Sequence, residues 1–408
     1  EKTAEQKYDT KKLRTMSTVE CSYLYDRVWK FCTYVDSIKE AFLHRTYSLD
    51  IPYLVFHLPR SVERTVANES FYVAADVLMH DYLDHVRLRS LRWDGFVSFV
   101  PPISGFIGGT YQRPFEDIFH VSLSEETKFF VGHYLALAHE LGHAVEDDSG
   151  IAREWVEFLI SSRSEIDKEC SLGIRCPILR ERYMLLSEIM CDAIALKVAG
   201  VNTVREFLDY TVMSYPCKLF WGPEYRLQGQ RVKIGLYPFN WDALRIQTMV
   251  TYMMSSRNYD RYEPVYDSIL VTLQRELLRH LLDFDIIFEE LSQRYPFERD
   301  ELELHRISVE QFRPCIRCWL YRLGPTLGTL LSDFEQSPSR PFENVIARDF
   351  KIEEHEQTTF GNNLLSGIVD TKEEPCRILH AYYSVYSEGK RPSYGATIES
   401  ITRRRLSR

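Results

Sequence analysis

A histidine, a glutamate and a second histidine lie close together in the stretch LALAHELGHAVEDD, residues 135–148. His139 and His143 are four positions apart, and Glu140 follows the first of them. Positions four apart lie one above the other on an α-helix, so both imidazoles can bind a single metal ion. Glu140 is displaced around the helix and can reach a water on that ion without being a ligand. This is the physical logic of the His-Glu-x-x-His motif in zinc hydrolases, in which the glutamate is the general base.

A catalytic zinc ion also needs a third protein ligand and an open position for water. In one arrangement this ligand is a histidine six residues after the second, but that position is Ser149 here. Another arrangement takes a glutamate from a later helix, and the stretch SEIMCDAIAL offers Glu188 with Asp192 one turn further on. We expect Glu188 to bind the ion and Asp192 to accept a hydrogen bond from a ligand histidine. The alternatives are a solvated Glu188 and a histidine pair that is hydrogen-bonded inside the core.

The two motifs together resemble the gluzincin class of zinc metallopeptidases, with no family assigned within it. The matching residues are His139-Glu140-x-x-His143 and Glu188-x-x-x-Asp192. The resemblance covers about residues 117–200 and implies one zinc ion per chain and hydrolysis of peptide bonds. It also implies a helix-rich, two-lobed, zincin-like fold.

A second, weaker resemblance concerns the stretch HAYYSVY, residues 380–386. It is similar to the tyrosine-rich C-terminal segment from which helix-rich zinc oligopeptidases draw a transition-state donor. Since the tetrahedral oxyanion needs a stabiliser besides zinc, Tyr383 and His380 are the candidates for this role. The alternative is that both side chains pack inside a C-terminal helix.

The elements that must position these residues follow from the hydrophobic pattern. The pattern predicts strands within 96–112 and over 117–124, and helices over 125–145 (N-capped by Ser124), 152–163 and 180–200. The strand at 117–124 alternates apolar and polar residues, so we expect it at a free sheet edge where an extended peptide can pair with it.

The remaining chain is predicted to be mostly helical, which gives a mainly α fold with a small β-sheet (α+β). The predicted regions are an N-terminal helical region at 1–95, a zincin catalytic region at 96–260 and a C-terminal helical region at 261–408 that completes the cleft. A long amphipathic helix, or a pair of helices, is predicted over 265–295. The polar and acidic segment 351–375 is predicted to be a loop.

Composition excludes several classes of protein. The net charge of −9 disfavours sequence-independent binding to nucleic acid, and no apolar run is long enough to span a membrane. The polar N-terminus and nine scattered cysteines predict a cytoplasmic protein. The lone pair Cys315-x-x-Cys318 is too little for a structural zinc site.

The sequence therefore predicts a zinc-dependent metallopeptidase that acts on a peptide or protein substrate. Two alternatives stay open: a catalytically silent zincin-fold scaffold or binding protein, and a regulatory peptidase dedicated to one protein partner. The sequence does not predict the oligomeric state.

Overall fold

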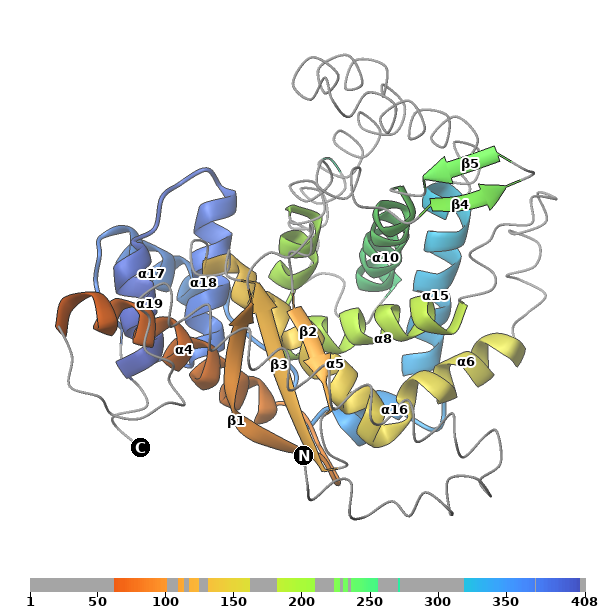
Figure 1. The fold of residues 1–408 in the computed structure, drawn as a ribbon, viewed down its shortest axis with the longest axis horizontal. Helices are drawn as coiled ribbons and strands as arrows, with labels where there is room; N and C mark the ends of the chain where they lie inside the picture. Colours follow the sequence, from red (N-terminus) through yellow and green to blue (C-terminus); the bar gives the residue numbers. More distant parts are fainter. Residues whose placement is uncertain are drawn as a thin grey trace, which may run out of the picture.

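The computed structural model describes much of the chain, and every structural statement below concerns this part. It comprises residues 62–100, 109–113, 117–124, 131–161, 182–209, 224–227, 230–233, 236–255, 271, 319–370 and 372–403. The fold is mainly helical with a small β-sheet, which confirms the predicted fold class (Figure 1). The two-lobed arrangement and the three predicted regions stay predictions.

Helical elements make up most of the described fold, and the two sequence motifs lie on two of them. They are α4 (Val62–Leu83), the 3₁₀ turn η2 (Val131–Leu135), α5 (Ala136–Ser149), α6 (Ile151–Ser161), α8 (Arg182–Ala199), α10 (Leu236–Ser255), the π-helical turn η6 (Trp319–Leu323), α15 (Gly324–Glu335), α16 (Pro341–Val345), α17 (Glu354–Leu365), α18 (Pro375–Ser387) and α19 (Tyr394–Arg403). The strands are β1 (Arg92–Val100), β2 (Gly109–Gln112), β3 (Ile118–Ser124), β4 (Glu224–Leu227) and β5 (Gln230–Lys233).

The main sheet has the strand order β1-β3-β2. β3 is parallel to β1 and antiparallel to β2, so it has a neighbour on both sides. The prediction of a free edge at 117–124 is therefore wrong. His120 and Ser122, whose polarity suggested an exposed strand, are both buried. The strand on the edge nearer to α5 is β2, and β4 and β5 form a separate hairpin.

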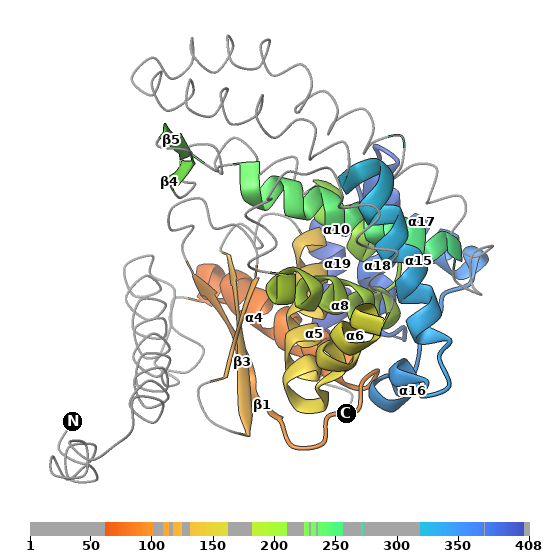
Figure 2. The same ribbon diagram turned by 90° about the vertical axis from the view of Figure 1, so that its right-hand side faces the viewer.

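The helices that carry the motifs lie on one side of the main sheet (Figure 2). α5 contacts β2 and β3 and packs closely along α8, and α8 in turn contacts α10. The apolar face of α5, which includes Leu137, Leu141 and Ala144, joins the hydrophobic core. This core is built from α4, the sheet, α5, α8, α10, α15 and α18. α5 is therefore packed against both the sheet and α8.

Two predicted boundaries differ from the structure. Residues 131–135 form the turn η2, and the α-helix begins only at Ala136. The segment 351–375, predicted to be a loop, contains α17. A reciprocal capping box between Glu353 and Glu356 starts this helix, and Phe360 and Leu364 bury one of its faces. The segment is mostly polar, so these two apolar residues, one helical turn apart, were not enough to predict a helix from the sequence.

Several predictions fall outside the described residues: the helices within 1–61, the amphipathic segment 265–295 and the pair Cys315-x-x-Cys318. Among the helices that are described, none is long and apolar enough to span a membrane.

Candidate metal centre

Three of the predicted residues meet at the interface between α5 and α8. Nε2 of His139 lies 3.2 Å from Oε2 of Glu188, and Nε2 of His143 lies 3.5 Å from Oε1 of the same carboxylate. The two imidazole rings are nearly perpendicular, with centroids 5.0 Å apart. One potential ligand atom from each residue lies within 4.8 Å of the others. The structure thus brings together the three residues that the sequence selects as metal ligands.

The separations between these atoms suit a zinc ion. Zinc binds imidazole nitrogen and carboxylate oxygen at about 2.1 Å in a tetrahedron, which places any two ligand atoms roughly 3.4 Å apart. The nitrogen–oxygen distances, 3.2 Å to Oε2 and 3.5 Å to Oε1 of Glu188, are close to this value, and one ligand atom from each residue lies within 4.8 Å of the others. Three protein ligands leave the fourth tetrahedral position open for water or substrate. The donor set of two imidazoles and one carboxylate is that of a catalytic zinc site.

The close approach of α5 to α8 depends on Gly142, which lies between the two histidines. A Cβ atom at this position would lie 2.7 Å from the Cα of Cys191 and 2.9 Å from its carbonyl oxygen. Only a residue without a side chain lets the two backbones come this close. Since Glu188 lies one turn before Cys191 on α8, this contact brings its carboxylate to the histidines.

We expect Gly142→Ala to destabilise the protein by about 1–3 kcal/mol, because the new methyl group meets backbone that cannot rotate away. Zinc binding should weaken as well, since α8 must shift away from the histidines. Urea denaturation and a zinc titration measure the two effects. Gly395→Ala is the control, because a Cβ there meets nothing within 4 Å. Equal stability of the two variants would contradict the role of Gly142.

Asp192 lies behind the first histidine, as predicted. Its Oδ1 is 2.9 Å from Nδ1 of His139, the ring nitrogen that faces away from Glu188. A carboxylate in this place holds the imidazole in the tautomer that presents Nε2 to a metal. Asp192 is itself buried and fixed by a residue that the sequence did not reveal, Arg245 of α10.

Arg245 forms a bidentate interaction with Asp192. Its Nε and Nη2 donate to the two carboxylate oxygens at 2.7 and 2.8 Å, and its Nη1 lies 3.1 Å from Oε2 of Glu188. The guanidinium also lies over the ring of Phe207, 4.3 Å from the centroid. Arg245 therefore compensates the charge of the buried Asp192 and the partly buried Glu188, which both contact the histidine pair. No local motif surrounds Arg245 in the sequence, because only the packing of α10 on α8 gives it this role.

The carboxylates and the arginine set the protonation of the first histidine. Burial lowers the pKa of His139, but its hydrogen bonds to Asp192 and Glu188 outweigh burial and raise this pKa to about 10. Burial alone would raise the pKa of Glu188, yet the charge of Arg245 and the contact with His139 lower it well below its usual range. His143 behaves differently, since burial and the neighbouring His139 lower its pKa.

Zinc binding to protein that has been stripped of metal should therefore release a proton. At pH 8, His139 is protonated, and it must lose this proton to become a ligand, whereas His143 is already neutral. Affinity for zinc should rise about tenfold per pH unit until pH is near 10. Calorimetric titration in buffers of different ionisation enthalpy counts the released protons. An enthalpy that does not depend on the buffer would contradict this protonation state.

Glu140, the candidate general base, lies next to His139 in α5. Its side chain is buried, with 5% exposure, and burial raises the pKa of this carboxyl to about 7. The backbone N–H of Tyr111 in β2 donates a hydrogen bond to the carboxylate. The ring of Tyr111 is stacked against His143, with centroids 6.1 Å apart. The edge strand β2 thus runs directly beside the candidate metal centre.

The acidic end of α5 holds the neighbouring elements in place. Negative side chains at a helix C-terminus oppose the helix dipole, so the run Glu146-Asp147-Asp148 needs compensating interactions. Each carboxylate has partners on another element, which were not evident from the sequence. Ser187 donates to Glu146, the Tyr111 hydroxyl donates to Asp147 at 2.8 Å, and the backbone amides of Arg89, Ser90 and Leu91 donate to Asp148. These contacts tie α8, β2 and the start of β1 to α5.

Tyr383 and His380, the two candidates for oxyanion stabilisation, are buried in α18. The Tyr383 hydroxyl donates to Asp209, and Nδ1 of His380 lies 3.4 Å from the carbonyl oxygen of Ala199. Ala199 is at the far end of α8, roughly 16 Å along the helix axis from Glu188. The structure does not bring either residue to the three-residue group, and their predicted role gains no support from these contacts.

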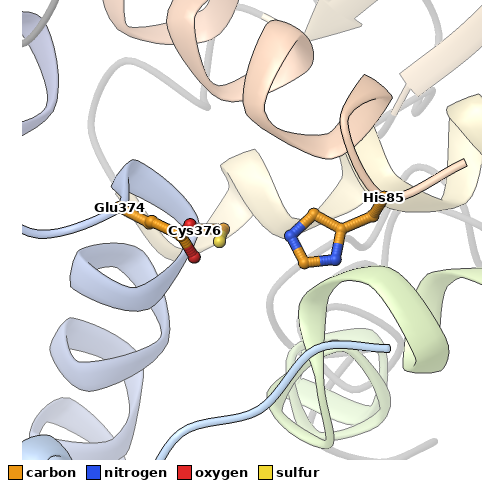
Figure 3. A group of neighbouring side chains, drawn as sticks. All are labelled: His85, Glu374 and Cys376. Carbon is orange, nitrogen blue, oxygen red and sulfur yellow. The ribbon is translucent and has the colours of Figure 1, made fainter. Parts of the chain in front are cut away.

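A second group of possible ligands lies at the junction of α4 and α18. Figure 3 shows His85, Glu374 and Cys376, whose ligand atoms lie within 4.8 Å of one another. The guanidinium of Arg348 already contacts two of these residues. Its Nη2 is 2.9 Å from Nε2 of His85, and its Nη1 is 3.0 Å from Oε1 of Glu374. Nδ1 of His85 also lies 2.8 Å from the carbonyl oxygen of Arg348, so both ring nitrogens are engaged and we assign no metal to this group.

Comparison of the chain with protein-family models, with curated proteins and with solved structures finds no match. The functional argument therefore depends on the geometry of the candidate metal centre itself.

Proposed function

We propose that the protein is a zinc-dependent metallopeptidase. The observation that carries this proposal is the meeting of His139, His143 and Glu188, with one ligand atom from each within 4.8 Å of the others, beside the buried carboxyl of Glu140. These three ligands would hold one zinc ion per chain. A structural zinc site has four protein ligands, whereas this group offers three and has a potential base next to it.

The residues around the centre have complementary roles in this proposal. When bound, zinc polarises the substrate carbonyl and lowers the pKa of a bound water towards neutrality. Glu140 accepts a proton from that water and passes it to the leaving amine, for which a pKa near neutrality is well suited. Asp192 holds the tautomer of His139, and Arg245 keeps the carboxylates of Asp192 and Glu188 in place.

The neighbouring strand supports an extended peptide as the substrate. The sequence assigned this role to the strand at 117–124, but β3 is paired on both sides. β2 is an edge strand of the sheet and lies against α5, with Tyr111 in contact with both Glu140 and His143. A peptide that pairs with the outer edge of β2 would have its backbone beside the metal centre.

The metal content of the purified protein tests the proposal. We expect one zinc ion per chain in the parent, a large loss in Glu188→Ala and no change in Glu343→Ala, which removes an exposed glutamate far from the motifs in sequence. Hydrolysis of a peptide library by the zinc-loaded parent is the second measurement. A parent that takes up no zinc when it is offered would refute the proposal. Zinc bound without hydrolysis of any peptide would instead favour a non-catalytic scaffold.

A further inference from the structure

The two candidate ligand histidines are supported by different chemical groups. Nε2 of each ring faces Glu188, so Nδ1 is the nitrogen left to bond with the protein. Nδ1 of His139 faces the carboxylate of Asp192 at 2.9 Å. Nδ1 of His143 faces the sulfur of Cys191 at 3.2 Å. A thiol therefore occupies the place that a carboxylate, a backbone carbonyl or a water usually takes behind a metal-bound histidine.

The thiol belongs to a short chain of polar contacts. Sγ of Cys191 lies 3.8 Å from Oε2 of Glu146, within reach of a weak S–H hydrogen bond. The hydroxyl of Ser187 donates to the same oxygen. A thiol has one hydrogen to donate and a sulfur that accepts weakly. Donation towards Glu146 leaves the sulfur free to accept the Nδ1–H of His143.

The position of the sulfur is set by the packing of the two helices. Cys191 is completely buried, and its backbone lies against Gly142, the residue that precedes His143. The ring and the thiol are thus brought together by the closest contact between α5 and α8. The sequence alone does not mark Cys191 for this place, since its position beside His143 depends on this contact.

We propose that Cys191 is the positioning residue for His143: its sulfur accepts the Nδ1–H of the ring and so directs Nε2 to the metal. This inference rests on the proposed zinc site. It makes the two imidazoles unequal ligands, one backed by a carboxylate and the other by a neutral thiol. The carboxylate of Glu146 lies beyond the thiol, with its Oε2 3.9 Å from the same Nδ1 and outside hydrogen-bond distance of the ring.

The test compares zinc affinity, by competition with a chelator, in the full-length parent and three variants. Cys191→Ala should weaken zinc binding by about 10- to 100-fold, the usual effect of removing the group behind a ligand histidine. Cys191→Ser restores an acceptor and should recover much of the loss. Cys376→Ala is the matched control, because it also removes a completely buried thiol, and it should bind zinc as the parent does.

Nuclear magnetic resonance of the imidazole nitrogens gives a readout that needs no metal. Before zinc is added, the parent and the serine variant should show His143 as the Nδ1–H tautomer, and the alanine variant should show a mixture of tautomers. Cobalt in place of zinc then shows whether the sulfur of Cys191 binds the metal itself. If the sulfur contacts only the ring of His143, the parent should show no thiolate-to-cobalt charge-transfer band.

Three outcomes would overturn the inference. An unchanged zinc affinity and tautomer in Cys191→Ala would show that the thiol is only part of the core. A charge-transfer band that disappears in this variant would make the sulfur a ligand. A parent that binds no zinc at all would overturn the proposed function together with this inference, whereas the first two outcomes leave the proposed function standing.

Discussion

Replacing Glu140 by glutamine is expected to lower kcat for peptide hydrolysis by about 10²- to 10⁴-fold, the range over which a general base contributes. Glutamine has the same shape, and its carbonyl oxygen can still accept the backbone N–H of Tyr111. It cannot take a proton from water at neutral pH. Since Glu140 is not among the three ligands, zinc content should stay at one ion per chain, and KM should change little.

Steady-state kinetics on a peptide from the library, with metal analysis of the same preparation, decide this prediction. Glu157→Gln is a suitable control, because it makes the same change on an exposed position of α6. If Glu140→Gln keeps the activity of the parent, another group is the base. If the variant loses its zinc, the fall in kcat reflects the loss of the metal and not the loss of proton transfer.

Replacing Arg245 by methionine is expected to destabilise the protein by about 3–5 kcal/mol, the effect of breaking a buried ion pair by removing one partner. The change leaves Asp192 and Glu188 facing each other without the guanidinium between them. Methionine retains much of the apolar stem, so the loss comes mainly from the uncompensated carboxylates. Bound zinc should then stabilise the variant more than it stabilises the parent, because it supplies the missing positive charge beside Glu188.

Denaturant unfolding with and without zinc measures both parts of this prediction. The zinc-free curves report the change in the fold, and at one fixed concentration of free zinc the added stability reports the dissociation constant of each protein. Arg340→Met is the control: this arginine is 69% exposed and pairs with Glu343 on the surface, where we expect an effect below about 0.5 kcal/mol. Similar unfolding curves for the two variants would show that Arg245 is not needed for charge compensation.

The parts of the site that the sequence predicted are those set by helical periodicity. The spacing of His139 and His143 within α5, and of Glu188 and Asp192 within α8, follows from 3.6 residues per turn. The structure places these four side chains together at one helix–helix interface. A local pattern is sufficient when the relevant residues share one face of a regular element.

The parts that the sequence missed depend on contacts between distant elements. Arg245 reaches the site only because α10 packs on α8, and nothing near it in the sequence marks this role. Alternation in the strand at 117–124 indicated one exposed face, but pairing on both sides and burial of His120 contradict it. Tyr383 was chosen because residues 380–386 resemble a tyrosine-rich C-terminal segment, and its hydroxyl donates to Asp209.

All three candidate ligands come from α5 and α8, and this has a consequence for the entropy of the chain. A metal ion shared by His143 and Glu188 is a reversible cross-link that closes the 45-residue step between them. By the relation used for disulfide loops, closing a loop of this length removes chain entropy worth on the order of 4 kcal/mol for as long as the ion stays bound to both residues. Unlike a disulfide, this cross-link forms in a reducing environment and opens when a chelator removes the ion. The mutual packing of α5 and α8 would then be coupled to the local supply of zinc.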